Sequence, residues 1–217
     1  MADVLVVAEE ALVSIGIKMI LEMMGGFTVV AVDRDRALSA VAEHRPTVVL
    51  LDTHVTLRES VPLLTQLRDL ESCPALAVLT TLATPSTVLE SLRGGACGFL
   101  LKDSQPEQLV AAVRALASGV TVLAPEASSI MLGAACRGTL ASETSVDEIK
   151  QLSDREQTIV GLVGKGLTNA EIARRLFISD STVKEYVSVI LRKLGVANRV
   201  QAAVLAYAAG LTADDLA

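Results

Sequence analysis

The sequence has no tryptophan, two tyrosines and three phenylalanines among its 217 residues. Hydrophobic residues still make up 51% of the chain, so we expect aliphatic cores, and the length is typical of two small domains. No apolar run approaches the roughly 18 residues that are needed to cross a bilayer. The start, Met-Ala-Asp-Val-Leu, lacks the positive segment of a secretory signal. We therefore expect a soluble, cytoplasmic protein that does not enter a membrane.

Cysteine and histidine are also scarce. The cysteines Cys73, Cys97 and Cys136 are odd in number and do not have the spacing of metal ligands, and we expect them to be small buried or surface residues in a reducing cytoplasm. The histidines His44 and His54 have no Cys or His partner at ligand spacing. No Ser-His-Asp or Cys-His arrangement rises above chance, so we expect that the protein is not an enzyme.

The net charge of −6 is divided unevenly along the chain. Residues 1–149 carry 10 basic and 18 acidic side chains, whereas residues 150–217 carry 9 basic and 7 acidic ones. Between residues 163 and 200 the count is 7 basic against 3 acidic. An acidic module joined to a locally basic one is typical of a regulator with separate signal and DNA ends, although an ordinary solvated surface would carry similar charges.

The first half of the chain alternates short apolar runs with amphipathic segments. The predicted strands are Val4–Val7, Thr28–Val32, Thr47–Leu51, Ala75–Leu79 and Gly98–Leu101. The predicted helices are Ala11–Met24, Arg36–His44, one from about Val61, Pro85–Arg93 and Pro106–Ser118. In the first helix, apolar residues recur at helical spacing: Leu12, Ile15, Met19, Ile20 and Met23. The alternation predicts an α/β fold with a five-stranded parallel, doubly wound sheet that is covered on both faces.

Four polar residues follow the ends of predicted strands. They are Glu9, Asp52, Thr80 and Lys102. Ligands of such sheets bind in the crevice at the carboxyl ends of the strands. We therefore expect two carboxylates, a hydroxyl and an ammonium to converge on one edge of the sheet.

The second half of the chain contains two sequence patterns that are typical of the start of a helix. Ser153 is followed three residues later by Glu156, and Thr168 is followed by Glu171, which are two capping boxes. The next helix begins after Ser179 or Ser181, and its inward apolar stripe consists of Val183, Val187, Ile190, Leu191 and Leu194. Two helices joined by a short turn, with basic residues near the end of the second, form the helix-turn-helix pattern of DNA-binding proteins.

A further helix is expected at each end of this region. Glu126–Ala135 precedes it, followed by a segment, Cys136–Val146, whose Ala, Ser, Thr and Gly content is that of a flexible linker. Val196–Gly210 is the last helix of an all-α, four-helix domain, and we expect its Val200, Ala203, Val204 and Tyr207 on one face.

Four short motifs carry a resemblance to a known family. They are Leu-Ser-Asp-Arg-Glu at 152–156, Gly-Leu-Thr-Asn-Ala-Glu-Ile-Ala at 166–173, Ser-Thr-Val-Lys at 181–184 and Lys-Leu-Gly-Val at 193–196. With them, Leu152–Leu211 resembles the LuxR/NarL/FixJ helix-turn-helix, and residues 1–120 resemble the receiver domain of response regulators. The resemblance implies a receiver at 1–120, a linker with a short helix at 121–146 and a DNA-binding domain at 147–217.

The resemblance also assigns roles to the predicted pocket. Asp52 holds the position of the aspartate that accepts a phosphoryl group in the family. Thr80 and Lys102 match the hydroxyl and the lysine that contact that group, and Phe99 matches an aromatic residue linked to switching.

The sequence departs from the family where Mg²⁺ is held. Two acidic residues follow the first strand in the family, but here the sequence is Ala8-Glu9-Glu10, and Ala8 supplies no oxygen. Mg²⁺ demands near-ideal octahedral geometry, so a site made by Glu9 and Asp52 would be weak or absent, with Glu10 nearby in the pocket. The Met-Pro that commonly follows the acceptor is also replaced, by Val55-Thr56.

For DNA, the resemblance places the helix that begins near Ser181 in the major groove. It implies base contacts from Lys184, Glu185 and Ser188. Lysine can donate to guanine and glutamate can accept from cytosine. For Glu185 a solvent-facing position is the equal alternative. Phosphate contacts are implied for Thr182, Lys193 and Arg199.

Dimers of the family commonly form through the last helix. We expect Ala202, Leu205 and Ala206 to be exposed there and to form a dimer surface. A homodimer or a heterodimer with a related regulator would supply the second half of a two-fold DNA site.

The sequence is thus interpreted as a DNA-binding transcription regulator with an atypical receiver, controlled by dimerisation or partner binding more than by phosphorylation. Its partner would be double-stranded DNA. One alternative is a conventional two-component regulator, activated by a histidine kinase at Asp52. Another is an interaction protein that titrates a second regulator. The only cofactor considered is Mg²⁺, for which the ligand set is incomplete.

Overall fold

The structure, a computed structural model, describes residues 3–53, 60–70, 73–136 and 149–212. His54, Val55-Thr56 and nearly all of the predicted linker segment lie outside these residues. The chain divides into two compact units, the first formed by Met1–Ala117 with Val122–Ile130 and the second by Ser118–Thr121 with Met131–Ala217. Among the described residues, no helix is long and apolar enough to cross a membrane.

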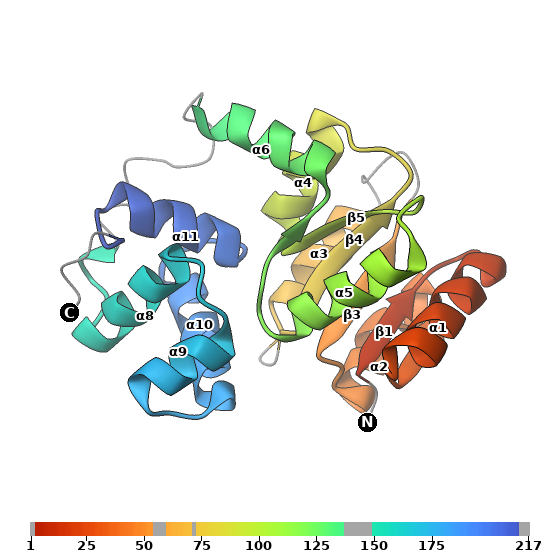
Figure 1. Cartoon of the computed structure of the whole chain (residues 1–217), viewed down its shortest axis with the longest axis horizontal. Helices are drawn as coiled ribbons and strands as arrows, with labels where there is room; N and C mark the ends of the chain where they lie inside the picture. The colour runs from red at the N-terminus through yellow and green to blue at the C-terminus, as the bar shows by residue number, and fades with distance from the viewer. Residues whose placement is uncertain (1–2, 54–59, 71–72, 137–148, 213–217) are drawn as a thin grey trace. The chain divides into compact units, whose positions relative to one another are not determined.

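The first unit is built on a parallel sheet of six strands in the order β2-β1-β3-β4-β5-β6 (Figure 1). The strands are β1 (Val4–Val7), β2 (Val29–Val32), β3 (Val48–Asp52), β4 (Ala75–Thr80), β5 (Gly98–Leu101) and β6 (Val122–Leu123). The predicted parallel α/β architecture is confirmed. The sixth strand was not predicted, because two residues are too few to give a hydrophobic pattern. It pairs with β5 through Gly98↔Val122 and Phe99↔Leu123.

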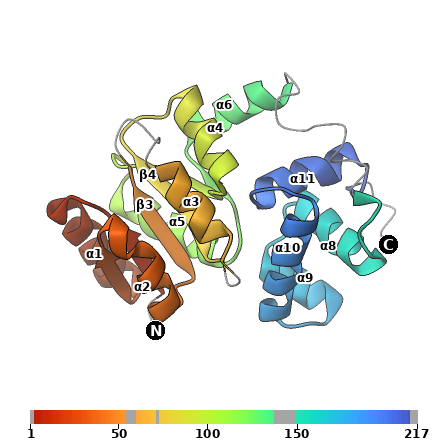
Figure 2. The same cartoon turned by 180° about the vertical axis from the view of Figure 1, so that it is seen from behind.

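Helices cover both faces of this sheet. They are α1 (Ala11–Gly25), α2 (Ala37–His44) after a 3-10 turn at Arg34–Arg36, α3 (Ser60–Arg68), α4 (Pro85–Gly94) and α5 (Pro106–Ala117). α1 and α5 lie side by side on one face (Figure 1), and α3 packs beside α4 on the other (Figure 2). The helix predicted from residue 126 is α6 (Pro125–Cys136).

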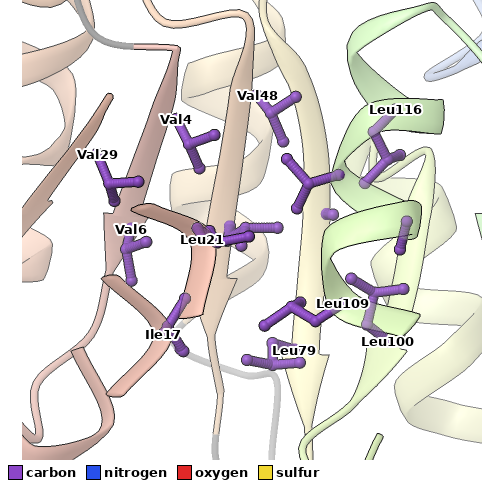
Figure 3. Close-up of a cluster of buried hydrophobic side chains, with 14 of the residues drawn as sticks. Val4, Val6, Ile17, Leu21, Val29, Val48, Leu79, Leu100, Leu109 and Leu116 are labelled. Atoms are coloured by element: carbon purple, nitrogen blue, oxygen red, sulfur yellow. The ribbon is translucent and has the colours of Figure 1, made fainter. Parts of the chain in front are cut away.

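The core between the sheet, α1 and α5 is aliphatic, as the lack of aromatic residues requires. Figure 3 shows valines of the strands packed against leucines and isoleucines of the helices, including Val4, Val48, Ile17, Leu21 and Leu109. α1 reaches this core through Ile17 and Leu21, which are buried. Most of the apolar stripe noted in its sequence faces outward instead.

In residues 149–212 of the second unit, four helices enclose a separate core. They are α8 (Asp154–Gly164), α9 (Asn169–Leu176), α10 (Asp180–Lys193) and α11 (Arg199–Ala208). Both predicted capping boxes are present, and Ser179 caps α10 by accepting a hydrogen bond from the Thr182 amide. Phe177, with φ 55°, ends α9 in the left-handed region, and Gly195, with φ 62°, follows α10.

One expectation for α11 is wrong. Ala202, Leu205 and Ala206, which were expected to be exposed, have relative exposures of 2%, 2% and 0%. They pack in the core of the second unit because α11 lies along α8. On the face expected to carry Val200, Ala203, Val204 and Tyr207, the first three residues are half-buried and Tyr207 is 76% exposed. A dimer surface on α11 therefore cannot use the three predicted residues as exposed contacts.

Candidate functional site

The centre of the first candidate site is a buried ion pair at the carboxyl edge of the sheet. Asp52 is the last residue of β3, and Lys102 directly follows β5. Lys102 Nζ lies 2.6 Å from Asp52 Oδ1, and the two side chains are 18% and 2% exposed. No described donor meets hydrogen-bond geometry at this Oδ1, so the contact is a close ion pair rather than a directed hydrogen bond.

Thr80 comes from β4, which lies next to β3, and Phe99 comes from β5, which lies on the far side of β4. Thr80 ends β4 and is buried, and its hydroxyl accepts a long hydrogen bond, 3.5 Å, from the Leu82 amide. Phe99 lies within β5 and is fully buried. The Lys102 amide donates to the Thr80 carbonyl at 2.8 Å, which holds the ends of β4 and β5 in register. The parallel ladder thus brings Asp52, Thr80 and Lys102 to one edge, as expected.

Glu9 has a partner that the sequence did not reveal. Its Oε1 lies 3.2 Å from Arg34 Nε, and the Glu9 side chain is 57% exposed. The Nε and Nη1 atoms of Arg34 are buried and make no hydrogen bond within the described residues, so the Glu9 carboxylate is their nearby counter-charge. The ion pair follows from the pairing of β1 with β2. Val7 lies opposite Val32 in this register, so the residues that come after the two strands lie close together. A single sequence does not give that register.

These residues do not fit a Mg²⁺ site. Ala8 contributes no ligand atom, Glu9 faces Arg34, and the Asp52 carboxylate faces Lys102. Glu10 is exposed at the position that precedes α1. No group of three His, Cys, Asp or Glu side chains in the described part of the chain is arranged to hold a metal ion. Two cationic side chains therefore stand beside the carboxylates that a metal would need.

The second candidate site is the outer face of α10. Lys184 and Glu185 are exposed, and Lys184 Nζ lies 3.4 Å from Asp180 Oδ2 one turn earlier. Both partners of that pair are close to half exposed, so the pair is weak and Lys184 can exchange it for another acceptor. Ser188 is partly buried and its hydroxyl donates to the Lys184 carbonyl at 3.0 Å.

The start of α10 holds a cluster of hydroxyl groups. Ser179 Oγ lies 2.8 Å from both Ser181 Oγ and Thr182 Oγ1. Thr182, expected to contact phosphate, therefore belongs to the cap of this helix. The amide groups at the same helix start form the positive end of the helix dipole, which favours anions.

Lys193 and Arg199, also expected to contact phosphate, have partners inside the second unit. Lys193 Nζ lies 2.8 Å from Glu156 Oε1, and the Glu156 side chain is 7% exposed. Arg199 Nη1 donates to Asn169 Oδ1 at 2.7 Å, and its Nη2 donates to the Leu167 carbonyl. These contacts join the helices to one another. Phosphate binding by the same two residues stays a prediction.

Three other arginines on the helix-turn-helix are exposed: Arg174 and Arg175 in the last turn of α9, and Arg192 in the last turn of α10. The side chains of Arg175 and Arg192 have no hydrogen bond or ion pair with the residues that the structure describes. Sequence reasoning missed both, because Lys193 and Arg199 appeared equally available before their internal partners were known.

Comparison with protein families gives two matches. The family model described as the response regulator receiver domain matches residues 4–114. The model described as bacterial regulatory proteins, luxR family, matches residues 150–206. Together they cover both units, and the first alone spans half of the chain.

Relatives that match most of the chain agree with these matches. The nitrate/nitrite response regulator protein NarL of Escherichia coli (strain K12) is 33% identical over 205 residues, 94% of this chain and 94% of NarL. The DNA-binding transcriptional activator DevR/DosR of Mycobacterium tuberculosis is 34% identical over 170 residues, 78% of this chain and 76% of DevR/DosR. A solved structure of the RcsB response regulator of Salmonella typhimurium has the same fold, with a TM-score of 0.53 and 21% identity over 96% of this chain and 99% of that chain.

The buried pair predicts a large effect of removing one charge. Lys102→Met should lower the free energy of unfolding of the first unit by about 3–5 kcal/mol, because the Asp52 carboxylate would stay buried without its partner. Urea unfolding followed by circular dichroism measures this. The double variant Asp52→Asn with Lys102→Met is the control and should recover most of the loss. A loss below about 1 kcal/mol, the size typical of exposed pairs, would contradict a desolvated pair.

The pair of Glu156 with Lys193 predicts a pH dependence. The Lys193 ammonium, together with the Ser153 amide and hydroxyl, lowers the pKa of the Glu156 carboxyl. A carboxyl with a lowered pKa stabilises the fold above its unfolded pKa, and this stabilisation is lost as the pH falls through the folded pKa. Glu156→Gln should therefore be less stable than the wild type at pH 7, and the difference should shrink below about pH 4.3.

Tyrosine fluorescence can follow this unfolding in the full chain. The chain has no tryptophan, and its two tyrosines, Tyr186 and Tyr207, both lie in the second unit. Glu185→Gln, at an exposed glutamate of the same unit, is the matched control and should show little pH-dependent difference. If the difference in stability between Glu156→Gln and the wild type were the same at pH 7 and at pH 3, the ionised Glu156 carboxylate would not be its source.

Proposed function

The chain belongs to the LuxR family of response regulators, and from this premise we propose that it is a sequence-specific DNA-binding transcription regulator controlled by dimerisation or partner binding more than by phosphorylation. The proposal that phosphorylation has a minor role rests on one observation, the ion pair of 2.6 Å between Lys102 and the buried Asp52. Two further features support it: Ala8 has no side-chain oxygen for a metal ion, and Glu9 pairs with Arg34.

Charge balance explains why these contacts matter. A carboxylate is a poor nucleophile toward an anionic phosphoryl group unless cations offset the repulsion. Lys102 supplies one cation, but its ammonium already neutralises the acceptor oxygen itself. Glu9 lies beside the Arg34 guanidinium, which would repel a second cation. The pocket therefore favours a resting pair over a reactive carboxylate.

A conventional phosphorylation switch is the second candidate. The acceptor, hydroxyl and lysine positions of the family are filled by Asp52, Thr80 and Lys102, and all three lie at the same sheet edge. The relatives named as NarL and DevR/DosR are a response regulator and a transcriptional activator. A histidine kinase would act on this chain only in this second candidate.

For the DNA-binding surface, we assign base reading to Lys184 and Glu185 of α10. Both are exposed, and within the described part of the chain the Lys184 ammonium has only a weak pair with Asp180. Phosphate contacts are assigned to Arg175 and Arg192, because these exposed arginines lack a counter-charge among the described residues. Half or more of the hydrogen bonds of protein–DNA interfaces go to the DNA backbone. Exposed arginines near α10 can therefore contact phosphates while Lys184 and Glu185 contact bases.

The assignment of Lys184 can be tested once a bound site has been mapped by footprinting. Lys184→Ala should weaken binding to that site by about 1–3 kcal/mol and leave binding to a scrambled duplex nearly unchanged. Arg192→Ala is the matched contrast on the same helix: it should weaken both duplexes alike and reduce the salt slope by about 1. An equal loss on both duplexes for Lys184→Ala would make Lys184 a phosphate contact.

The control by phosphorylation can be tested directly. We expect little phosphoryl adduct after incubation with acetyl phosphate and Mg²⁺, measured as added mass on the intact chain, and no change in oligomeric state. Asp52→Asn provides the background signal. A stoichiometric adduct on the wild type that is absent from Asp52→Asn would establish the second candidate in place of the first.

A further inference from the structure

A hollow lies in the first unit between α1 and the start of α5, and we call it the α1–α5 hollow. Its volume is about 230 Å³. The buried side chains of Ile17, Leu79 and Leu109 form its apolar floor, and Figure 3 shows all three in the core between the sheet and the helices. An apolar cavity of about 150 Å³ can hold benzene, so this hollow is large enough for roughly eight to ten non-hydrogen atoms.

Two polar side chains, Lys102 and Ser104, also line the hollow. The Lys102 ammonium has three hydrogen-bond donors, and its side chain pairs only with Asp52 among the residues that the structure describes. None of the described residues that line the hollow is acidic. The hollow therefore combines an apolar floor with one cation that has donors left for an anion.

Charge and shape together favour a monocarboxylate with an apolar body. Residues 1–149 carry 18 acidic against 10 basic side chains, and this balance repels a multiply charged anion more strongly than a singly charged one. A carboxylate accepts charge-assisted hydrogen bonds from an ammonium group. Each methylene that is buried in an apolar hollow raises the affinity about fourfold, so the body contributes as well as the charge.

Gly16 keeps the hollow open on the side of α1. Glycine is among the least favourable residues inside a helix, yet a Cβ added at Gly16 would meet no atom within 4 Å. No described neighbour therefore requires a glycine at this position. Because Gly16 lines the hollow, the missing side chain leaves space that a ligand can occupy.

We propose that the α1–α5 hollow binds a small monocarboxylate with an apolar body of about six to eight carbon atoms. The carboxylate pairs with Lys102, and the body packs on the apolar floor. The ligand and Asp52 then compete for one ammonium, so occupation of the hollow is coupled to the ion pair of the receiver pocket. This inference goes beyond the proposed function and does not depend on DNA binding.

Octanoate is a probe of suitable size and charge. The full chain, labelled with ¹⁵N, is titrated with octanoate, and the amide shifts are followed by NMR. Octanoate should bind saturably with a Kd of about 5 mM or less, which ordinary ligand efficiency gives for ten non-hydrogen atoms. The amides of Gly16, Lys102 and Leu109 should shift. Absence of saturable shifts at these residues would overturn the proposal.

Two related compounds separate the contributions of charge and body. Octanamide has the shape of octanoate without its charge, and acetate has the charge without the body. Each should bind at least about tenfold more weakly than octanoate, because each lacks one of the two interactions. Equal binding of octanamide would overturn the pairing with Lys102, and equal binding of acetate would overturn the role of the hollow.

Gly16→Leu tests the position of the ligand. The added side chain should occupy the hollow and weaken octanoate binding at least about tenfold. It should not lower stability, because leucine favours a helix and its Cβ meets no neighbour. Ala11→Leu is the matched control: it adds the same side chain to α1 at an exposed position that does not line the hollow, and binding should be unchanged. Unchanged binding by Gly16→Leu would overturn the proposal.

Variants at the ion pair test the carboxylate. Asp52→Asn removes the internal competitor for Lys102 and should strengthen octanoate binding about two- to fivefold, the range typical of partly exposed charge pairs. Asp52→Asn with Lys102→Met removes both charges, so that neither is left unpaired, and should bind octanoate and octanamide alike. A double variant that still prefers octanoate would show that another group binds the carboxylate, and would overturn the assignment of Lys102.

A second copy of the chain is the alternative occupant of the hollow. The titration is therefore repeated at a tenfold higher protein concentration. A constant Kd supports the small-molecule site, whereas a Kd for octanoate that rises with protein concentration would mean that another copy covers the hollow. A chain that binds octanoate as expected but never binds a random-sequence duplex at low salt would remove the proposed function and leave this site in place.

Discussion

The in-register parallel pairing of β1, β3, β4 and β5 is the constraint on which the receiver pocket depends. Each pairing aligns the carboxyl ends of neighbouring strands. The backbone hydrogen bonds of the sheet therefore bring residues that are far apart in sequence to the same edge. Asp52 and Lys102 are 2.6 Å apart only because β3, β4 and β5 end at one level. These strands are buried on both faces, and the aliphatic cluster that they form with α1 and α5 packs against them.

In both units, cationic side chains form ion pairs with carboxylates of the same unit. Lys102 and Arg34 lie against carboxylates of the first unit, and Lys193 lies against the buried Glu156 of the second. From the sequence, Lys102 and Lys193 were predicted to contact a phosphoryl group and a DNA phosphate, because their internal partners are not visible there. In the folded chain each is already engaged, and the cations left for outside partners are the exposed ones with weak or no internal pairs.

Prediction from sequence succeeded where a signal was local. Strand and helix positions followed from short apolar runs and helical spacing, and the capping boxes at Ser153 and Thr168 marked helix starts to the residue. It failed where tertiary packing decided. The small apolar residues of α11 looked like a surface, yet α8 covers them, and the apolar residues of α1 looked like a core stripe, yet the core takes Ile17 and Leu21 instead. A helix with apolar residues on two faces does not reveal which face is buried.

The short strand β6 has a mechanical consequence. It is an edge strand of two residues, held to β5 by hydrogen bonds from the Val122 amide to the Cys97 carbonyl, 3.2 Å, and from the Ala124 amide to the Phe99 carbonyl, 2.8 Å. Each such bond contributes only about 1 kcal/mol net. The chain that continues into α6 is thus joined to the sheet through a two-residue edge strand on β5, the strand that ends next to Lys102. Release of this strand would add its residues to the segment that joins the two units, and it would expose Val122, which packs against the core of the first unit.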